Sequence, residues 1–250
     1  MKGWHIFLHS VQMVLRNLHP ALQIGLVPIV LMAILSTVLT SSTGLSLDML
    51  GNEQMMRTAF ENGQINIGGL LLFACISVFF TLWIFVNWHR YVLLEEYPTG
   101  WIPPLRLDRI LTYFGKSLMI GLAMAVMLVP LGLAFLLGPI GALLFVLGAF
   151  FVVVTGYRWF LLLPAAAIGD PLSMREAWDK TRGASGGIIL MLVLVMMTQV
   201  GLDVAIRLIA AVLPIAALVV QWCVALVLML VNVSLLTTMY GHFIQDRPIN

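Results

Sequence analysis

Charged side chains are scarce in this chain of 250 residues, where Asp, Glu, Lys and Arg together make up 10%. An ordinary soluble domain carries about 25% charged residues. Hydrophobic residues reach 61%, and the mean hydropathy is +1.04. A soluble fold of this size cannot hide so much apolar surface from water. The composition excludes a disordered chain, a coiled coil and an ordinary soluble enzyme, and it predicts an all-α, polytopic membrane protein with one membrane domain.

Cysteine and the usual catalytic motifs are also lacking. Cys75 and Cys223, the two cysteines, stand in apolar runs without zinc or disulfide spacing, so we expect two buried thiols. The net charge of +2 is too small to indicate a nucleic-acid partner. His5 and His9 are four residues apart, a spacing that suits a metal, but the polar face of a helix at the membrane surface is the simpler interpretation. The sequence predicts no catalytic residue, no cofactor and no metal.

Six apolar stretches are each long enough to cross a bilayer, which takes about 20 residues. Two breaks divide neighbouring stretches into hairpins. The dipeptide Gly138-Pro139 is typical of a turn, and Pro214 stands where a helix start tolerates proline. The predicted spans cover approximately residues 21–39, 67–88, 114–137, 140–163, 188–209 and 213–239.

The cations are divided very unevenly between the two sides of these spans. Eleven of the thirteen Lys and Arg residues fall on the side of the termini, and only Arg57 and Arg207 fall on the other. Cytoplasmic loops carry an excess of Lys and Arg. We therefore predict a multi-pass protein with both termini in the cytoplasm.

Short amphipathic segments are predicted beside the spans. On the cytoplasmic side they cover residues 4–18, 105–113 and 171–182, and a fourth, residues 47–60, lies in the outer loop with Leu47, Leu50 and Phe60 as apolar anchors. Ser173 and Glu176 have the spacing of a capping box at the start of a helix. The chain thus divides into three units of one interfacial helix and one hairpin, and whether these units are true repeats stays open.

One part of the sequence resembles a known group. Residues 157–165 (YRWFLLLPA) and 171–183 (PLSMREAWDKTRG) combine an arginine near a span end, a Leu-Pro exit and a short helix that ends in E-A-W-x-x-T-R-G. This pattern resembles the bacterial membrane domain fused to some glycerophosphodiester phosphodiesterases, and its stand-alone six-span relatives of unknown function. The resemblance implies the six-span fold and the bacterial cytoplasmic (inner) membrane. It implies no catalytic residues, because the phosphodiesterase chemistry belongs to a separate soluble domain.

Polar residues inside the spans are candidates for function or for packing. Asp203 and Arg207 are four residues apart in the fifth span, so they form either a structural ion pair or part of a transport path. Arg158 either extends to lipid headgroups or bonds to residues 171–182. Uncharged polar residues that can bond across helices are Gln199, Gln221 and Asn232. Close helix packing is expected at the pairs Gly121/Ala125 and Gly201/Ala205.

The leading functional hypothesis is a non-enzymatic scaffold, accessory subunit or assembly factor. Its partners would be membrane lipids or another membrane protein, contacted through a basic and aromatic belt. The belt consists of Trp4, Arg16, Arg106, Arg109, Arg175, Lys180 and Arg182. One alternative is a small transporter or channel that uses the region of Asp203 and Arg207. The other is a lipid-handling protein that acts at the cytoplasmic interface through His5, His9, His89 or Arg158.

Overall fold

The computed structural model describes residues 2–43 and 53–249, and all regular structure within these ranges is helical. Six of its helices are long and apolar enough to cross a membrane, so the multi-pass membrane class is confirmed. The helices are α1 (Lys2–Arg16), α2 (Leu18–Thr43), α4 (Glu53–Glu61), α5 (Ile67–Leu94), α6 (Leu107–Leu133), α7 (Pro139–Trp159), α8 (Leu162–Ile168), α9 (Met174–Lys180), α10 (Ser185–Val212) and α11 (Pro214–Phe243), with one 3-10 turn, η1 (Ala134–Leu137).

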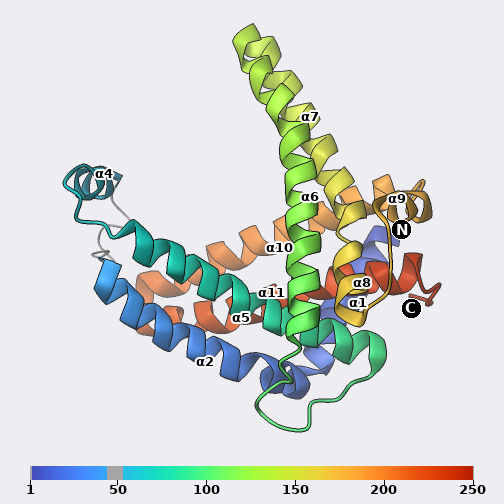
Figure 1. The fold of residues 1–250 in the computed structure, drawn as a ribbon, viewed down its shortest axis with the longest axis horizontal. Coiled ribbons are helices and arrows are strands. Elements are labelled where there is room, and N and C mark those ends of the chain that lie inside the picture. The colour runs from blue at the N-terminus through green and yellow to red at the C-terminus, as the bar shows by residue number, and fades with distance from the viewer. Residues whose placement is uncertain (1, 44–52, 250) are drawn as a thin grey trace.

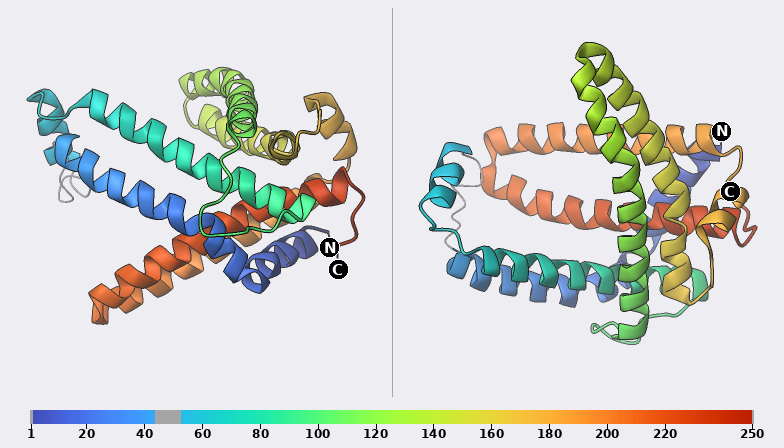
Figure 2. Two further views of the ribbon diagram at one scale, coloured as in Figure 1. Left: turned by 60° about the horizontal axis from the view of Figure 1, so that its bottom comes forward. Right: turned by 45° about the horizontal axis from the view of Figure 1, so that its top comes forward.

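The long helices form three hairpins, α2 with α5, α6 with α7 and α10 with α11, which diverge from a common base (Figures 1 and 2). We call this base the hub and define it as residues 2–24, 80–94, 110–120, 152–191 and 230–244. Most of the buried core lies in the hub, and both chain termini lie there (Figure 1). The three hairpins are therefore joined at one end and separate at the other.

The turns that close two of the hairpins follow from local sequence. Gly138 has a φ of +66°, which glycine adopts without strain, and Pro139 starts α7 at a position where its missing N–H is not needed. Pro214 starts α11 in the same way. These are the two breaks that the sequence predicts.

Helix α1 is held against α10 and α11 by a narrow stripe of its own residues. Gly3, Ile6, Ser10 and Val14 are buried. Gly3 touches Gly187 of α10 so closely that a Cβ on Gly3 would stand 2.1 Å from the Gly187 carbonyl oxygen. The Ser10 hydroxyl lies 2.9 Å from Thr238 of α11. The first helix of the chain is thus locked to its last two.

One predicted helix is not found as a separate element. Residues 105–113 form no helix of their own, because α6 begins at Leu107 and continues without a break, and no glycine or proline interrupts its first two turns. The fourth apolar span, Pro139–Ile168, contains a turn that the sequence analysis does not predict, since α7 ends at Trp159 and α8 begins at Leu162. Pro164 explains this break, since its ring clashes with the carbonyl group four residues earlier.

The predicted glycine contacts are also wrong. A Cβ on Gly121 or Gly201 would meet no described atom within 4 Å. The close approach in the second hairpin uses α7 glycines instead, and a Cβ on Gly148 would stand 2.4 Å from the Leu131 side chain of α6. The expected burial of the two thiols fails as well, because Cys75 and Cys223 are both exposed on the flanks of their helices.

The other three short helices are found near their predicted places. The Ser173 hydroxyl accepts a hydrogen bond from the Glu176 backbone N–H, as a capping box requires, and Gly183 follows α9 with a φ of +79°. In the loop between α2 and α5, α4 covers Glu53–Glu61 and leaves Phe60 exposed. The predicted anchors Leu47 and Leu50 lie outside the described residues.

Candidate functional site

A row of small hydroxyl residues on α11 forms the polar centre of the hub. Ser234, Thr237 and Thr238 are buried on one face of the helix. The indole N–H of Trp88 in α5 donates to Ser234 Oγ at 2.8 Å, and a ring nitrogen of His89 lies 2.8 Å from Thr237 Oγ1. Because buried polar groups must be paired, these bonds fix how α5 lies against α11.

His89 is enclosed between α5, α6 and α11. Its Nδ1 lies 2.8 Å from the Thr237 hydroxyl, which also donates to the Val233 carbonyl of its own helix at 3.0 Å. Its Nε2 faces the Tyr113 hydroxyl at 3.4 Å. The side chain is fully buried. His89 is therefore a structural residue, and it is enclosed too completely to act on a lipid at the membrane surface.

A second cluster joins α5 to the loop that follows it and to α8. Arg90 is buried, donates from Nε to Glu96 at 2.9 Å and makes a second, shorter bond to the same carboxylate. It also donates to the Ala167 carbonyl at 3.0 Å. Arg106 donates at 3.0 Å to Oε2 of Glu96, the same oxygen that accepts from Arg90 Nε. The hydrogen bonds from Arg90 hold the pKa of Glu96 below its usual value, with a smaller contribution from Arg106.

The third polar contact involves the C-terminal tail. The Tyr240 hydroxyl donates to Asp170, and Arg247 donates to the Leu93 carbonyl at 2.9 Å. These bonds hold α11 and the residues after it against α5 and α8.

The polar centre of the hub was not predicted from the sequence. The available signal was the polar run Asn87-Trp88-His89-Arg90 near the end of a span, opposite the hydroxyl residues of α11.

Arg158 is enclosed at the end of α7 and is not extended to the surface. Its guanidinium lies 4.3 Å from the centre of the Trp178 ring in α9, and it donates to the Ser185 hydroxyl at the start of α10. Stacking on an aromatic ring suits the planar, weakly hydrated guanidinium. Of the two interpretations left open, the contact with residues 171–182 is the one found. Arg158 ties three helices together.

The remaining intramembrane candidates lie on the surface of the third hairpin. Arg207 Nε donates to Asp203 Oδ2 at 2.8 Å, and the two side chains are 79% and 59% exposed. Gln199, one turn before Asp203, is exposed on the same face of α10. Gln221 is also exposed, whereas the amide N–H of Asn232 donates to the Leu228 carbonyl of its own helix at 2.8 Å. Gln199, Asp203 and Arg207 therefore form a polar stripe on an uncovered flank of α10.

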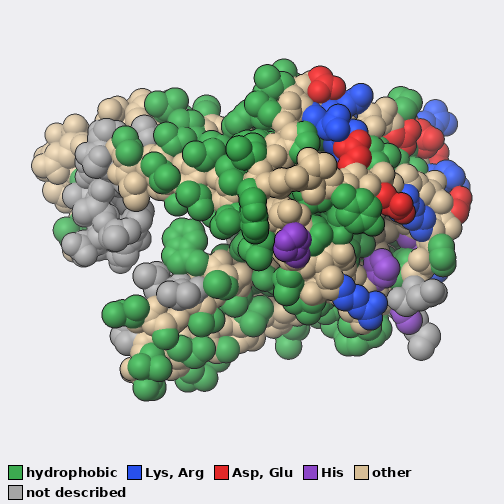
Figure 3. Space-filling model, turned by 90° about the horizontal axis from the view of Figure 1, so that it is seen from below, with side chains coloured by type: hydrophobic (Ala, Val, Ile, Leu, Met, Phe, Trp, Pro, Cys, Tyr) green, Lys and Arg blue, Asp and Glu red, His purple; other side chains and the backbone are tan. Residues whose placement is uncertain are grey.

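The predicted belt is divided between exposed and paired residues. Arg109 lies 3.1 Å from Asp108 and covers Gly169, while Arg106 pairs with Glu96. The exposed members are Trp4, Arg16, Arg175, Lys180 and Arg182. In the view from below, charged side chains gather over the hub, and the surface around the outer parts of the hairpins is mostly apolar (Figure 3). Within residues 2–43 and 53–249, no group of three or more His, Cys, Asp or Glu residues is placed to hold a metal ion.

Comparison of this chain with known proteins yields no matching family model, no matching curated protein and no matching solved structure. The resemblance to the phosphodiesterase-associated membrane domain consequently stays a prediction from residues 157–165 and 171–183.

Proposed function

We propose that this protein is a non-enzymatic accessory subunit or scaffold of the bacterial cytoplasmic membrane, with the hub on the cytoplasmic side. The gathering of charged side chains over the hub supports this orientation (Figure 3). Both termini lie in the hub, as an even number of spans requires (Figure 1). The paired and buried hub residues serve to hold the hairpins and leave no acid, base or nucleophile free for catalysis among those described above.

The observation that carries the proposal is the uncovered polar stripe on α10. Ionisable residues in membrane helices almost always face a bundle interior or a water-filled cavity, because a charge at the bilayer centre costs about 3 kcal/mol even on insertion scales. Helix α10 ends at Val212, so Arg207 lies about 8 Å and Asp203 about 14 Å before that end. Arg207 can reach the outer headgroups, but Asp203 lies deeper, and its side chain is 59% exposed with Arg207 of the same helix as its ion-pair partner. A polar face on a partner helix would cover this stripe.

The divergence of the hairpins gives such a partner room to bind. Only 11% of the residues in the apolar, membrane-spanning part of α10 are buried, and only 6% of those in the third span, Leu107–Leu137. From Thr198 to Ala210, every fourth residue of α10 is partly buried and all the others are exposed. A helix from another membrane protein can therefore lie along α10 without displacing any contact of this chain.

The transporter hypothesis receives less support from the same geometry. A path for ions through Asp203 and Arg207 would enclose these side chains between helices, whereas both are more than half exposed. Their hydrogen bond also stays within α10 and joins no second helix.

Gentle native extraction followed by mass spectrometry tests the proposal. We expect a stoichiometric membrane-protein partner that is lost in the double variant Asp203→Asn/Arg207→Gln. The matched control is Arg57→Gln/Glu61→Gln, because this pair has the same spacing and a similar distance of 3.1 Å but lies in the short helix α4. Recovery of a solitary chain under several mild conditions would overturn the proposal, and a partner kept by the α10 double variant would show that the stripe is not the interface.

A further inference from the structure

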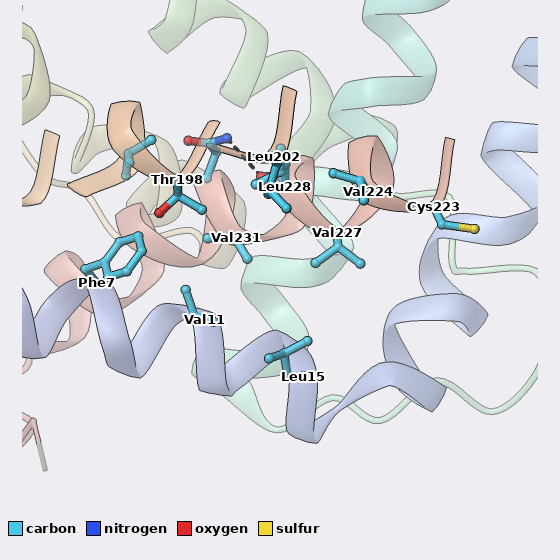
Figure 4. Close-up of a pocket in the computed structure, with 12 residues that line it drawn as sticks. Phe7, Val11, Leu15, Thr198, Leu202, Cys223, Val224, Val227, Leu228 and Val231 are labelled. Atoms are coloured by element: carbon cyan, nitrogen blue, oxygen red, sulfur yellow. Dashed lines mark hydrogen bonds between the residues drawn. The ribbon is translucent and has the colours of Figure 1, made fainter. Parts of the chain in front are cut away.

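A groove with a volume of about 370 Å³ lies between α1 and the third hairpin, beside the stripe through which α1 packs on that hairpin (Figure 4). Its walls come from α1, the middle of α10 and the middle of α11. Aliphatic and aromatic side chains form most of the lining, among them Phe7, Val11, Leu15, Leu202, Val227 and Val231.

The two hydrogen-bonding side chains with oxygen or nitrogen in the groove, Thr198 and Asn232, each donate one bond within their own helix. The Thr198 hydroxyl donates to the Leu194 carbonyl at 2.8 Å, and the Asn232 amide donates to the Leu228 carbonyl at 2.8 Å. No charged side chain lines the groove. Water needs two or more polar partners to occupy a cavity, so this space favours an apolar occupant.

The faces of α1 define what lies at the edge of the groove. Beside its buried stripe, α1 carries a second apolar stripe that includes Phe7, Val11 and Leu15, which line the groove, and the exposed residues Trp4 and Leu8. The remaining face is polar and basic, with Lys2, His5, His9, Gln12 and Arg16. No Asp or Glu occurs in the first 47 residues. On α1, the apolar stripe that lines the groove thus lies beside a face with donors and positive charge, and neither face carries an acid.

We propose that this groove binds one acyl chain of an anionic phospholipid from the leaflet on the hub side, with the phosphate at the basic face of α1. Two of the walls, α10 and α11, belong to helices long and apolar enough to span the membrane, so we expect lipid at the mouth of the groove. Arg16 directly follows Leu15, the last groove residue of α1, and is exposed to meet a headgroup. Cations at the membrane surface attract anionic lipids.

A lipid chain fits this groove better than a protein helix. Membrane helices associate through small residues or through hydrogen bonds across the interface. The lining offers mainly branched aliphatic side chains, it has no glycine, alanine or serine, and Thr198 and Asn232 each bond within their own helix. A flexible acyl chain needs neither feature.

Photo-crosslinking in vesicles of phosphatidylglycerol and phosphatidylcholine in equal amounts tests the site. The probe is phosphatidylglycerol with a diazirine in the middle of one acyl chain. We expect severalfold more labelling of residues 195–202 and 223–232 than of the exposed flank of α6, residues 118–126. Equal labelling of these segments would mean ordinary contact with bulk lipid only, and it would overturn the proposal.

Matched variants distinguish the two parts of the site. Val227→Trp fills the groove and should reduce labelling there severalfold, whereas Val126→Trp makes the same change on an exposed flank and should not. Arg16→Gln should remove the preference for phosphatidylglycerol over a phosphatidylcholine probe, whereas Lys116→Gln should keep it. Undiminished labelling of Val227→Trp contradicts the groove, and an undiminished preference in Arg16→Gln contradicts the headgroup contact. The comparison of segments in the unmodified protein remains decisive if Val227→Trp does not fold.

Discussion

Replacing Gly3 by alanine tests how tightly α1 is docked on α10. The new Cβ would stand 2.1 Å from the Gly187 carbonyl oxygen and 3.0 Å from the carbonyl carbon, and both are backbone atoms that cannot rotate away. Helix α1 would have to move outward. That movement loosens Ile6 and Val14, which are 1% and 0% exposed, and stretches the contact between Ser10 and Thr238.

The magnitude follows from two opposing effects. Overpacking at a close contact costs about 1–3 kcal/mol. Alanine favours a helix over glycine by up to about 1 kcal/mol, which offsets part of this cost. The net loss is about 1–2 kcal/mol, which for a chain of this size lowers the melting temperature by about 2–8 °C.

The same contact provides the control. A Cβ on Gly187 would have its nearest described neighbour at 3.5 Å, an ordinary contact, so Gly187→Ala should keep or raise the melting temperature. Thermal unfolding in a mild detergent, followed by tryptophan fluorescence, measures both variants. If Gly3→Ala is as stable as Gly187→Ala, α1 does not pack on α10 as described.

Two further predictions concern the polar contacts of the hub. Trp88→Phe removes the 2.8 Å hydrogen bond to Ser234. A double-mutant cycle with Ser234→Ala should give a coupling of about 1 kcal/mol in the free energy of unfolding. Additive effects of the two substitutions would show that the bond contributes nothing. Glu96→Gln should lower stability at neutral pH by about 2 kcal/mol, because it removes the charge that binds Arg90. Since the pKa of Glu96 is lowered by folding, its contribution is present above its unfolded pKa and is lost as the pH falls through the folded value. The variant and the unmodified protein should therefore converge in acid, and a gap that stays constant with pH would contradict the role of the ion pair.

The six spans could be predicted because the signals for them are local. Apolar length marks each helix, and Gly138-Pro139 and Pro214 mark two of the turns. The break at residues 160–161 was missed although Pro164 announces it, because the apolar run continues through it. Local signals also placed the capped helix after Ser173 correctly.

The contacts between helices were much harder to predict. Glycine spacing alone favoured Gly121 and Gly201 as points of close contact between helices. Whether a glycine touches another helix depends, however, on which face of its own helix is turned inward. The same uncertainty applies to Cys75, because an apolar residue in a membrane helix faces lipid as readily as protein. For the same reason the sequence left two alternatives for Arg158, lipid headgroups and residues 171–182. The position of Trp178 in α9 decides between them.

The docking of α1 has a consequence for the order in which the protein matures. Ser10 and Thr238 are separated by 228 positions, and Gly3 packs on Gly187, so the surface that receives α1 is synthesised long after α1 itself. The first and second hairpins can enter the membrane as they emerge from the ribosome, since each is a local unit. The hub closes only after α11 has been made, and until then we expect the apolar stripes of α1 to lie at the membrane surface. A chain truncated before Thr238 would therefore leave α1 undocked and open to proteolysis.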